Sequence, residues 1–211
     1  MSRKIPAHRT DCPYHVTART NNREWFELDL GEVWEIFEEQ LFFIHHAYGI
    51  KIHCFVLMTN HFHLILTDST GTLGKAMRWL MTETSREIGR RTGRKNRIYG
   101  QRNFKCLITS YHYYMHAYKY VYRNPVEVGS VHHTESYPYS TLHGLVGKKK
   151  LVIPVEEDPL MEDMDGNLKW LNSATEKQDW EIVGKALRKG EFKLAKDKNR
   201  NCEAELEKRR L

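Results

Sequence analysis

Two runs of β-branched and aromatic residues, 50–58 and 62–67, are separated by only three residues. Such runs favour β-strands. The connection permits only antiparallel pairing, because parallel strands need a crossover of a dozen or more residues. The segment Thr59-Asn60-His61 therefore predicts a tight turn. We expect this hairpin to lie at the centre of an antiparallel sheet.

Strand and helix patterns alternate on both sides of this hairpin. Residues 14–20 alternate as a strand does, and residues 29–32 resemble the capping box that begins a helix. That helix and a second one over residues 73–91 each carry an apolar stripe at spacings of three and four. The stripes consist of Val33, Phe37, Leu41, Ile44 and Tyr48, and of Leu73, Met77, Leu80, Thr84 and Ile88. Residues 104–110 predict a fourth strand, and residues 111–123 predict a third helix that Asn124 and Pro125 should end.

The resulting order is β-α-β-β-α-β-α, which is the split βαβ plan. It predicts an α+β, ferredoxin-like (RRM-like) sandwich in which helices cover one face of an antiparallel sheet, with an extra tyrosine-bearing helix. This fold hosts many functions, so function has to be inferred from the site.

The end of the chain differs in charge from the rest. Residues 151–211 contain 12 Lys and Arg against 14 Asp and Glu, so they carry −2 and the first 150 residues carry +8. We expect a domain over residues 1–150 and a charged, partly ordered C-terminal appendage over residues 151–211, with a short helix near residues 180–188. The run from Glu156 to Asp165 has six acids and no bases. It is either a solvated linker or a segment that folds over the basic domain and competes with a polyanionic partner.

Composition narrows the class of protein. The net charge of +6 favours a polyanionic partner, nucleic acid first. The four cysteines lie far apart without a CxxC pair, which argues against a zinc ribbon and a secreted disulfide framework. No segment approaches the roughly 20 apolar residues of a membrane span, and the first residues lack the apolar run of a signal peptide. We expect a cytoplasmic protein that needs neither a membrane nor a small-molecule cofactor.

His61 and His63 begin the third predicted strand. Because strand side chains alternate, the two imidazoles project from one face while Phe62 and Leu64 project from the other. Neutral imidazoles on one face suit a divalent metal ion. The alternative is a pair of exposed or hydrogen-bonded histidines without a metal.

The third predicted helix supplies a nucleophile. Tyr120 and Asn124 are four residues apart, so a phenol and an amide oxygen lie one turn apart on one side of the helix. Most of the other tyrosines of this helix should pack or stack: Tyr111, Tyr113, Tyr114, Tyr118 and Tyr122. A phenol with a pKa of about 10 attacks a phosphodiester only when the phosphate is polarised and aligned, which Mg²⁺ or Mn²⁺ can do. The product would be a covalent phosphotyrosine.

A basic segment follows the second predicted helix. Between Arg86 and Lys105 lie eight bases and one acid, Glu87. We predict that these cations contact DNA phosphates while Tyr99 and Phe104 stack on unpaired bases. The alternative is a solvated helix end. The complete predicted DNA-binding set is Arg19, Arg23, Arg90, Arg91, Arg94, Lys95, Arg97, Arg102 and Lys105.

Four motifs in this order resemble the REP-associated tyrosine transposases, a branch of the single-tyrosine HUH transposases. They are YHVTARTNNREWF, CFVLMTNHFHLIL, YKYVYRNPVEVG and SYPYSTLHGLVG, within residues 10–147. The chain departs from the family at Thr20, where glycine is common, at Thr59, where proline is common, and at Tyr99, where tryptophan is frequent. These departures leave the turn geometry and the DNA-sequence preference open.

The resemblance implies a role for each matching residue. It implies that His61 and His63 ligate the metal, Asn124 completes the metal site and Tyr120 is the nucleophile. It also implies a bacterial enzyme that uses Mg²⁺ or Mn²⁺, binds a DNA hairpin and cleaves single-stranded DNA beside it, as a monomer or a homodimer.

Three functions remain open. The first is this strand-transfer enzyme. The second is a domesticated, non-catalytic protein that binds hairpin nucleic acid through aromatic residues and arginines. The third is a metal-dependent phosphodiesterase in which water is the nucleophile.

Overall fold

The computed structural model describes residues 8–156 and 163–194, and its centre is a four-stranded antiparallel sheet. The strands are β1 (Pro13–Arg19), β2 (Ile50–Leu57), β3 (His61–Asp68) and β4 (Phe104–Leu107), in the order β2-β3-β1-β4. The predicted hairpin is confirmed, because β2 and β3 pair antiparallel and the backbone N–H of Met58 donates to the carbonyl oxygen of His61 at 2.8 Å. The predicted ferredoxin-like class is confirmed by this strand order.

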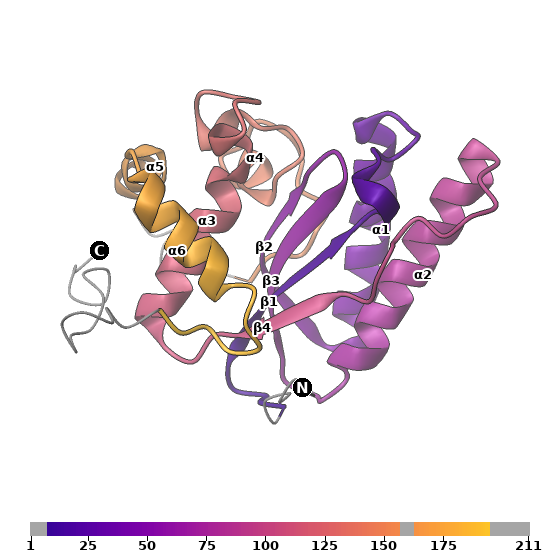
Figure 1. The fold of residues 1–211 in the computed structure, drawn as a ribbon, viewed down its shortest axis with the longest axis horizontal. Coiled ribbons are helices and arrows are strands. Elements are labelled where there is room, and N and C mark those ends of the chain that lie inside the picture. Colours follow the sequence, from indigo (N-terminus) through magenta and orange to yellow (C-terminus); the bar gives the residue numbers. More distant parts are fainter. Residues whose placement is uncertain (1–7, 157–162, 195–211) are drawn as a thin grey trace.

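One face of the sheet is covered by α1 (Leu30–Tyr48) and α2 (Leu73–Thr92), which lie side by side in Figure 1. The carboxylate of Asp29 accepts a hydrogen bond from the N–H of Gly31 at 2.8 Å and caps α1. The helix ends at Gly49, whose φ of 65° is the left-handed conformation that glycine tolerates best. Phe37 packs from α1 onto Phe62 of β3, with ring centroids 5.3 Å apart.

The opposite face is covered by α3 (Tyr111–Glu127), with α5 (Met164–Asn172) and α6 (Lys177–Ala186) packed against it (Figure 1). The short helix α4 (Thr141–Leu145) and two 3-10 turns, Asn21–Arg23 and Thr134–Ser136, complete the described elements. The extra tyrosine-bearing helix therefore lies on the face opposite α1 and α2, so the sheet is buried between two helical layers.

The predicted end of the third helix is wrong. The helix continues past Asn124 to Glu127, with Pro125 inside it. A proline removes the hydrogen bond that its own N–H would donate to the preceding turn, and its ring crowds the carbonyl group there. The next turn still closes, because Val128 donates to the carbonyl oxygen of Asn124 at 3.2 Å and Ser130 donates to that of Pro125 at 2.8 Å. α3 therefore keeps its last turn with Pro125 inside it.

The predicted fourth strand is also longer than the observed one. β4 ends at Leu107, although the N–H of Ile108 still bonds the carbonyl oxygen of Pro13 at 2.9 Å. Ser110 then caps the start of α3, because its hydroxyl oxygen accepts a hydrogen bond from the N–H of Tyr113.

The described part of the C-terminal appendage packs on the sheet. Val155 forms a parallel bridge with Ile52, and the N–H of Phe192 donates to the carbonyl oxygen of Leu107 at 2.8 Å. Phe192 is fully buried, and Ile153 is only 1% exposed. The acidic run from Glu156 to Asp165 falls largely in residues 157–162, outside the described residues, and the division of the chain at residue 150 stays a prediction. In the two described ranges, no helix has the length and apolarity required to cross a membrane.

Candidate active site

Strands β1 and β3 present polar side chains to the α3 layer. Thr17 lies opposite His63 in the register of the two strands, and Arg19 lies opposite His61. Phe62 lies in the core on the α1–α2 side. The predicted alternation is confirmed, and the imidazole centroids of His61 and His63 lie 5.0 Å apart.

Both histidines are held by a hydrogen bond at Nδ1. In His61 this atom lies 2.7 Å from the amide oxygen of Asn60, and in His63 it lies 2.8 Å from Nε2 of His15. Burial, aided by the charge of Arg19, lowers the pKa of His61 to about 4. Burial and the neighbouring histidines lower the pKa of His63 as well. Both rings are therefore neutral near pH 7, which leaves a nitrogen lone pair on each.

α3 places Tyr120 beside His63. The centroid of its ring lies 5.8 Å from that of His63, and the two rings are nearly perpendicular, at 83°. Tyr118 and Tyr122 are each 1% exposed and belong to the core between α3 and the sheet. The predicted packing of these two tyrosines is therefore confirmed.

Asn124 follows Tyr120 by one helical turn and is 7% exposed. Its amide nitrogen donates to the carbonyl oxygen of Tyr120 at 2.7 Å. The amide oxygen is therefore the end of the side chain that can act as a ligand. Its predicted role in the metal site stays a prediction.

Imidazole nitrogens and an amide oxygen are donors that divalent metal ions accept. Two neutral imidazoles and one amide oxygen would leave coordination sites for water and phosphate oxygens, as Mg²⁺ and Mn²⁺ require. Across the described ranges, no three His, Cys, Asp or Glu side chains gather into a metal cluster. A closed zinc site with four protein ligands is thus not formed by the described residues.

Three further neighbours of the predicted nucleophile were not predicted. Trp180 stacks on Tyr120 with ring centroids 4.2 Å apart and an interplanar angle of 22°. A Cβ atom placed on Gly184 would lie 3.3 Å from the hydroxyl oxygen of Tyr120. Burial raises the pKa of Tyr120, whereas the charges of Arg188 and Arg19 lower it. The spacing of four between Trp180, Gly184 and Arg188 was the available sequence signal, but a single sequence does not tell what such a stripe faces.

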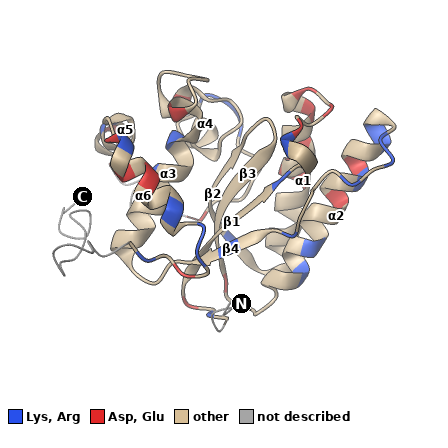
Figure 2. Ribbon diagram, in the orientation of Figure 1, with Lys and Arg blue, Asp and Glu red and all other residues tan. Residues whose placement is uncertain are grey.

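The cations of the basic segment differ in their partners, and all of them except Arg94 and Lys105 are exposed. Arg90 and Arg91 both bond the carboxylate of Glu87, and Arg94 bonds Glu24 and Glu27 at 2.9 Å each. Lys95, Arg97, Arg102, Arg19 and Arg23 are exposed, and Lys105 is half-buried, which lowers its pKa. Figure 2 shows basic residues at the end of α2 and in the following loop.

This loop runs beside the strand end that carries Arg19. The N–H of Asn21 donates to the carbonyl oxygen of Ile98 at 2.7 Å, and the N–H of Gly100 donates to that of Arg19 at 3.3 Å. The exposed cations of the loop therefore lie on the same end of the sheet as the start of β3.

The predicted stacking of Tyr99 on DNA bases is wrong. Tyr99 is 7% exposed, and its hydroxyl lies 2.8 Å from that of Thr84. Burial raises the pKa of this phenol, and the ring belongs to the core beneath α2. Phe104 is half-buried against the core on the α3 side.

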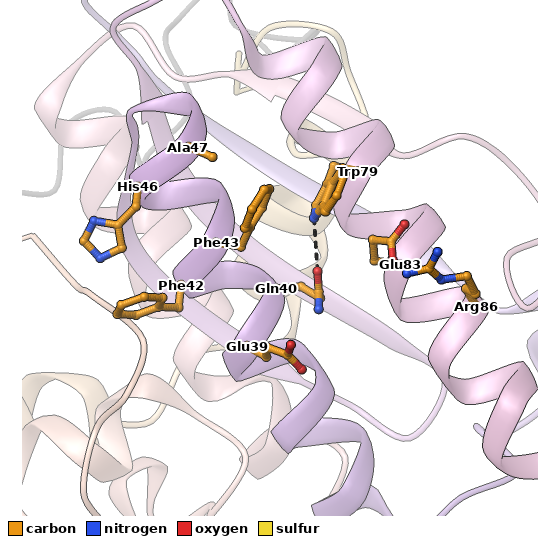
Figure 3. Close-up of a pocket in the computed structure, with 9 residues that line it drawn as sticks. All are labelled: Glu39, Gln40, Phe42, Phe43, His46, Ala47, Trp79, Glu83 and Arg86. Atoms are coloured by element: carbon orange, nitrogen blue, oxygen red, sulfur yellow. Dashed lines mark hydrogen bonds and ion pairs between the residues drawn. The ribbon is translucent and has the colours of Figure 1, made fainter.

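A separate hollow of about 730 Å³ lies between α1 and α2, away from the sheet (Figure 3). Phe43 stacks on Trp79 there, with ring centroids 4.5 Å apart, and the indole N–H of Trp79 donates to Gln40 at 3.1 Å. Phe42 is 46% exposed on the same helix. None of the predicted site residues lines this hollow.

Comparisons with known proteins place the chain in a family. A family model described as "Transposase IS200 like" matches residues 8–124, and no curated protein sequence matches. A solved structure described as a REP-associated tyrosine transposase bound to a REP hairpin is 21% identical, with a TM-score of 0.59, and the match covers 74% of this chain and 93% of that one. A second, described as a transposase from Deinococcus radiodurans, is 16% identical with a TM-score of 0.40, covering 57% and 95%.

The first solved structure has the same fold as this chain, although the two sequences are only 21% identical. The match to the family model spans more than half of the chain and includes both histidines, Tyr120 and Asn124. The family resemblance seen in the sequence motifs is therefore confirmed, and this chain belongs to the IS200-like transposases.

Proposed function

We propose that this chain is a metal-dependent endonuclease and strand transferase acting on single-stranded DNA, with Tyr120 as its nucleophile. The observation that carries the proposal is the position of Tyr120, whose ring lies 5.8 Å from that of His63 above the predicted metal ligands. The family membership supports a reaction on DNA. The nucleophile, the metal and the product are our proposal.

The ligands would be His61, His63 and the amide oxygen of Asn124. A bound Mg²⁺ or Mn²⁺ would polarise the phosphate and orient it for in-line attack. Tyr120 loses its phenolic proton to solvent, and its oxygen forms a bond to phosphorus. The bond from phosphorus to the 3′-oxygen breaks, and this oxygen takes up a proton from water. The products are a 5′-phosphotyrosine and a free 3′-hydroxyl, so attack by a second 3′-hydroxyl can rejoin DNA without ATP.

For the substrate we propose a DNA hairpin with a single-stranded flank. The solved structure with the same fold was bound to a REP hairpin, and the exposed cations Lys95, Arg97 and Arg102 are available for phosphate contacts in this chain. The enzyme would act as a monomer or a homodimer in the cytoplasm of a bacterial cell.

One denaturing gel tests the proposed reaction. The protein is incubated with labelled hairpin DNA and Mg²⁺ or Mn²⁺, and a parallel sample contains EDTA. We expect a covalent protein–DNA band that needs the metal. Cleavage without such a band would instead indicate a phosphodiesterase that uses water. Neither product, from a protein that still shifts the hairpin in a native gel, would indicate a domesticated hairpin-binding protein.

A further inference from the structure

The helix α6 turns one narrow stripe toward the predicted nucleophile. Trp180, Gly184 and Arg188 are spaced by four residues, so they follow one another along one side of a helix. α6 ends at Ala186, and a turn follows in which Leu187 keeps helical backbone angles and the N–H of Arg188 donates to the carbonyl oxygen of Lys185, three residues earlier. We call the three residues, two on α6 and one in this turn, the α6 stripe.

The first two members of the α6 stripe contact Tyr120 directly. Trp180 lies parallel to its ring at 4.2 Å, and the site of a Cβ on Gly184 lies 3.3 to 3.6 Å from the hydroxyl end of that ring. A glycine at this position lets the helix approach the phenol closely. The stacking orients the ring, and the glycine leaves space at its oxygen.

The third member brings a positive charge to the same place. Arg188 is exposed, and its charge acts on Tyr120 as well as on Arg19. Arg19 is also exposed and lies opposite His61 in the sheet. Two guanidinium groups that repel each other beside a nucleophile create a favourable position for an anion, and guanidinium binds phosphate through paired hydrogen bonds.

We propose that α6 forms one wall of the active site and that Arg188 is a catalytic residue that binds, with Arg19, the phosphate attacked by Tyr120. This inference rests on the proposed function. Arg188 makes and breaks no bond in this step. It binds an oxygen of the phosphate that Tyr120 attacks and stabilises the negative charge that grows on the phosphate oxygens during attack.

The segment that forms this wall lies outside the residues that match the family model. The family model ends at residue 124, whereas the α6 stripe lies at residues 180–188. An arginine supplied by this segment would therefore be a feature of this chain that the matched motifs do not contain.

Arg188→Ala tests the charge, and Lys185→Ala is its matched control. Lys185 lies on the same helix, is exposed and pairs with Glu181 at 3.6 Å, so its loss removes one positive charge that does not face Tyr120. The rate of covalent adduct formation with hairpin DNA and Mn²⁺ should fall about 100-fold in Arg188→Ala, by analogy with the loss of one transition-state donor. It should be partly restored in Arg188→Lys and unchanged in Lys185→Ala.

Gly184→Ala tests the wall itself. Alanine favours a helix more than glycine does, so this variant should fold, which thermal unfolding checks. Its methyl group should displace the Tyr120 hydroxyl and slow adduct formation without weakening hairpin binding. An unchanged rate would show that α6 does not lie against this hydroxyl during the reaction and would overturn the wall.

The outcomes separate this inference from the proposed function. If the wild-type protein forms an adduct and Arg188→Ala forms it at the same rate, the assignment of Arg188 is overturned while the proposed function stands. A faster rate in Arg188→Ala would also overturn it, because α6 would then hold Tyr120 back. If the wild-type protein forms no adduct, the proposed function fails, and the catalytic assignment of Arg188 fails with it.

Discussion

Nε2 of His15 lies 2.8 Å from Nδ1 of His63, across the pairing of β1 with β3. The other nitrogen of His15, Nδ1, is buried and has no hydrogen-bond partner in the described structure. If His63 binds a metal through Nε2, its Nδ1 must carry the proton and donate it to His15. The residue on β1 would then fix the tautomer and the ring orientation of a metal ligand.

We therefore expect His15→Phe to weaken Mn²⁺ binding by roughly 10- to 100-fold, the usual effect of losing such a partner. His15→Gln, whose side-chain oxygen can accept the same hydrogen bond, should retain more of the affinity. Calorimetric titration measures both variants, with thermal unfolding as a check on their folding. Equal affinity in wild type and His15→Phe would rule out this role.

Stability should also depend on pH through His61. Burial, together with a neighbouring charge, lowers the pKa of His61 from 6.5 to about 4. Between these values the unfolded chain binds a proton that the folded chain excludes, so the free energy of unfolding falls as the pH drops from 6.5 through 4. His61→Asn should flatten this decline in denaturant titrations in the presence of EDTA. Parallel pH profiles for the two proteins would contradict the assignment.

The basic segment should contribute unevenly to DNA binding. Arg97 is exposed, whereas Arg94 is bonded to Glu24 and Glu27 and its side chain is only 10% exposed. Arg97→Ala should lower the slope of log affinity against log salt by about 0.7 for a single strand or about 0.9 for a duplex. Arg94→Ala should mainly lower stability. Fluorescence anisotropy across a salt series measures the slopes, and a larger loss of slope in Arg94→Ala would contradict this division.

Arg123 should hold the C-terminal helices on α3. Its guanidinium bonds Glu127 at 2.7 Å and the carbonyl oxygens of Leu171 and Ser173 at 3.0 and 2.9 Å. The side chain is only 8% exposed, so its removal would leave buried oxygen acceptors without a hydrogen-bond donor. Arg123→Ala should therefore lower the free energy of unfolding by about 3 kcal/mol. Arg86→Ala, which breaks an exposed pair on α2, should cost about 1 kcal/mol or less.

Truncation after Lys150 extends this test to the whole appendage. It removes Ile153, Leu171, Val183 and Phe192, which are all buried. We expect the shortened chain to unfold at a lower denaturant concentration, because the α3 face of the sheet loses its cover. Unchanged stability would instead support residues 1–150 as an independent domain.

Local patterns explain which features the sequence could predict. The hairpin spacing determined the pairing of β2 with β3, and strand alternation placed His61 and His63 on one face. The spacing of four linked Tyr120 with Asn124. These features depend on residues close together in the sequence, where strand and helix geometry fixes the relation between side chains.

The features that could not be predicted depend on distant contacts. Trp180 and Tyr120 stack although they are 60 positions apart in the sequence, and nothing in either segment indicates the other. Tyr99 lies in a strongly basic segment, and the charged residues next to it in the sequence give no indication that its side chain is buried under α2. The sequence predicts that Asn124 and Pro125 end the third helix, because a local pattern does not contain the hydrogen bonds of the following turn that accommodate the proline.

The position of the covalent bond tests the central claim most directly. The adduct formed with hairpin DNA and Mn²⁺ is digested with protease and nuclease, and the peptide that carries the remaining nucleotide is sequenced by mass spectrometry. The proposed reaction predicts a phosphodiester on Tyr120, and it predicts no adduct in Tyr120→Phe, which keeps the ring and the stacking on Trp180. A nucleotide on any other residue, or an adduct that persists in Tyr120→Phe, would contradict the assignment of Tyr120 as the nucleophile.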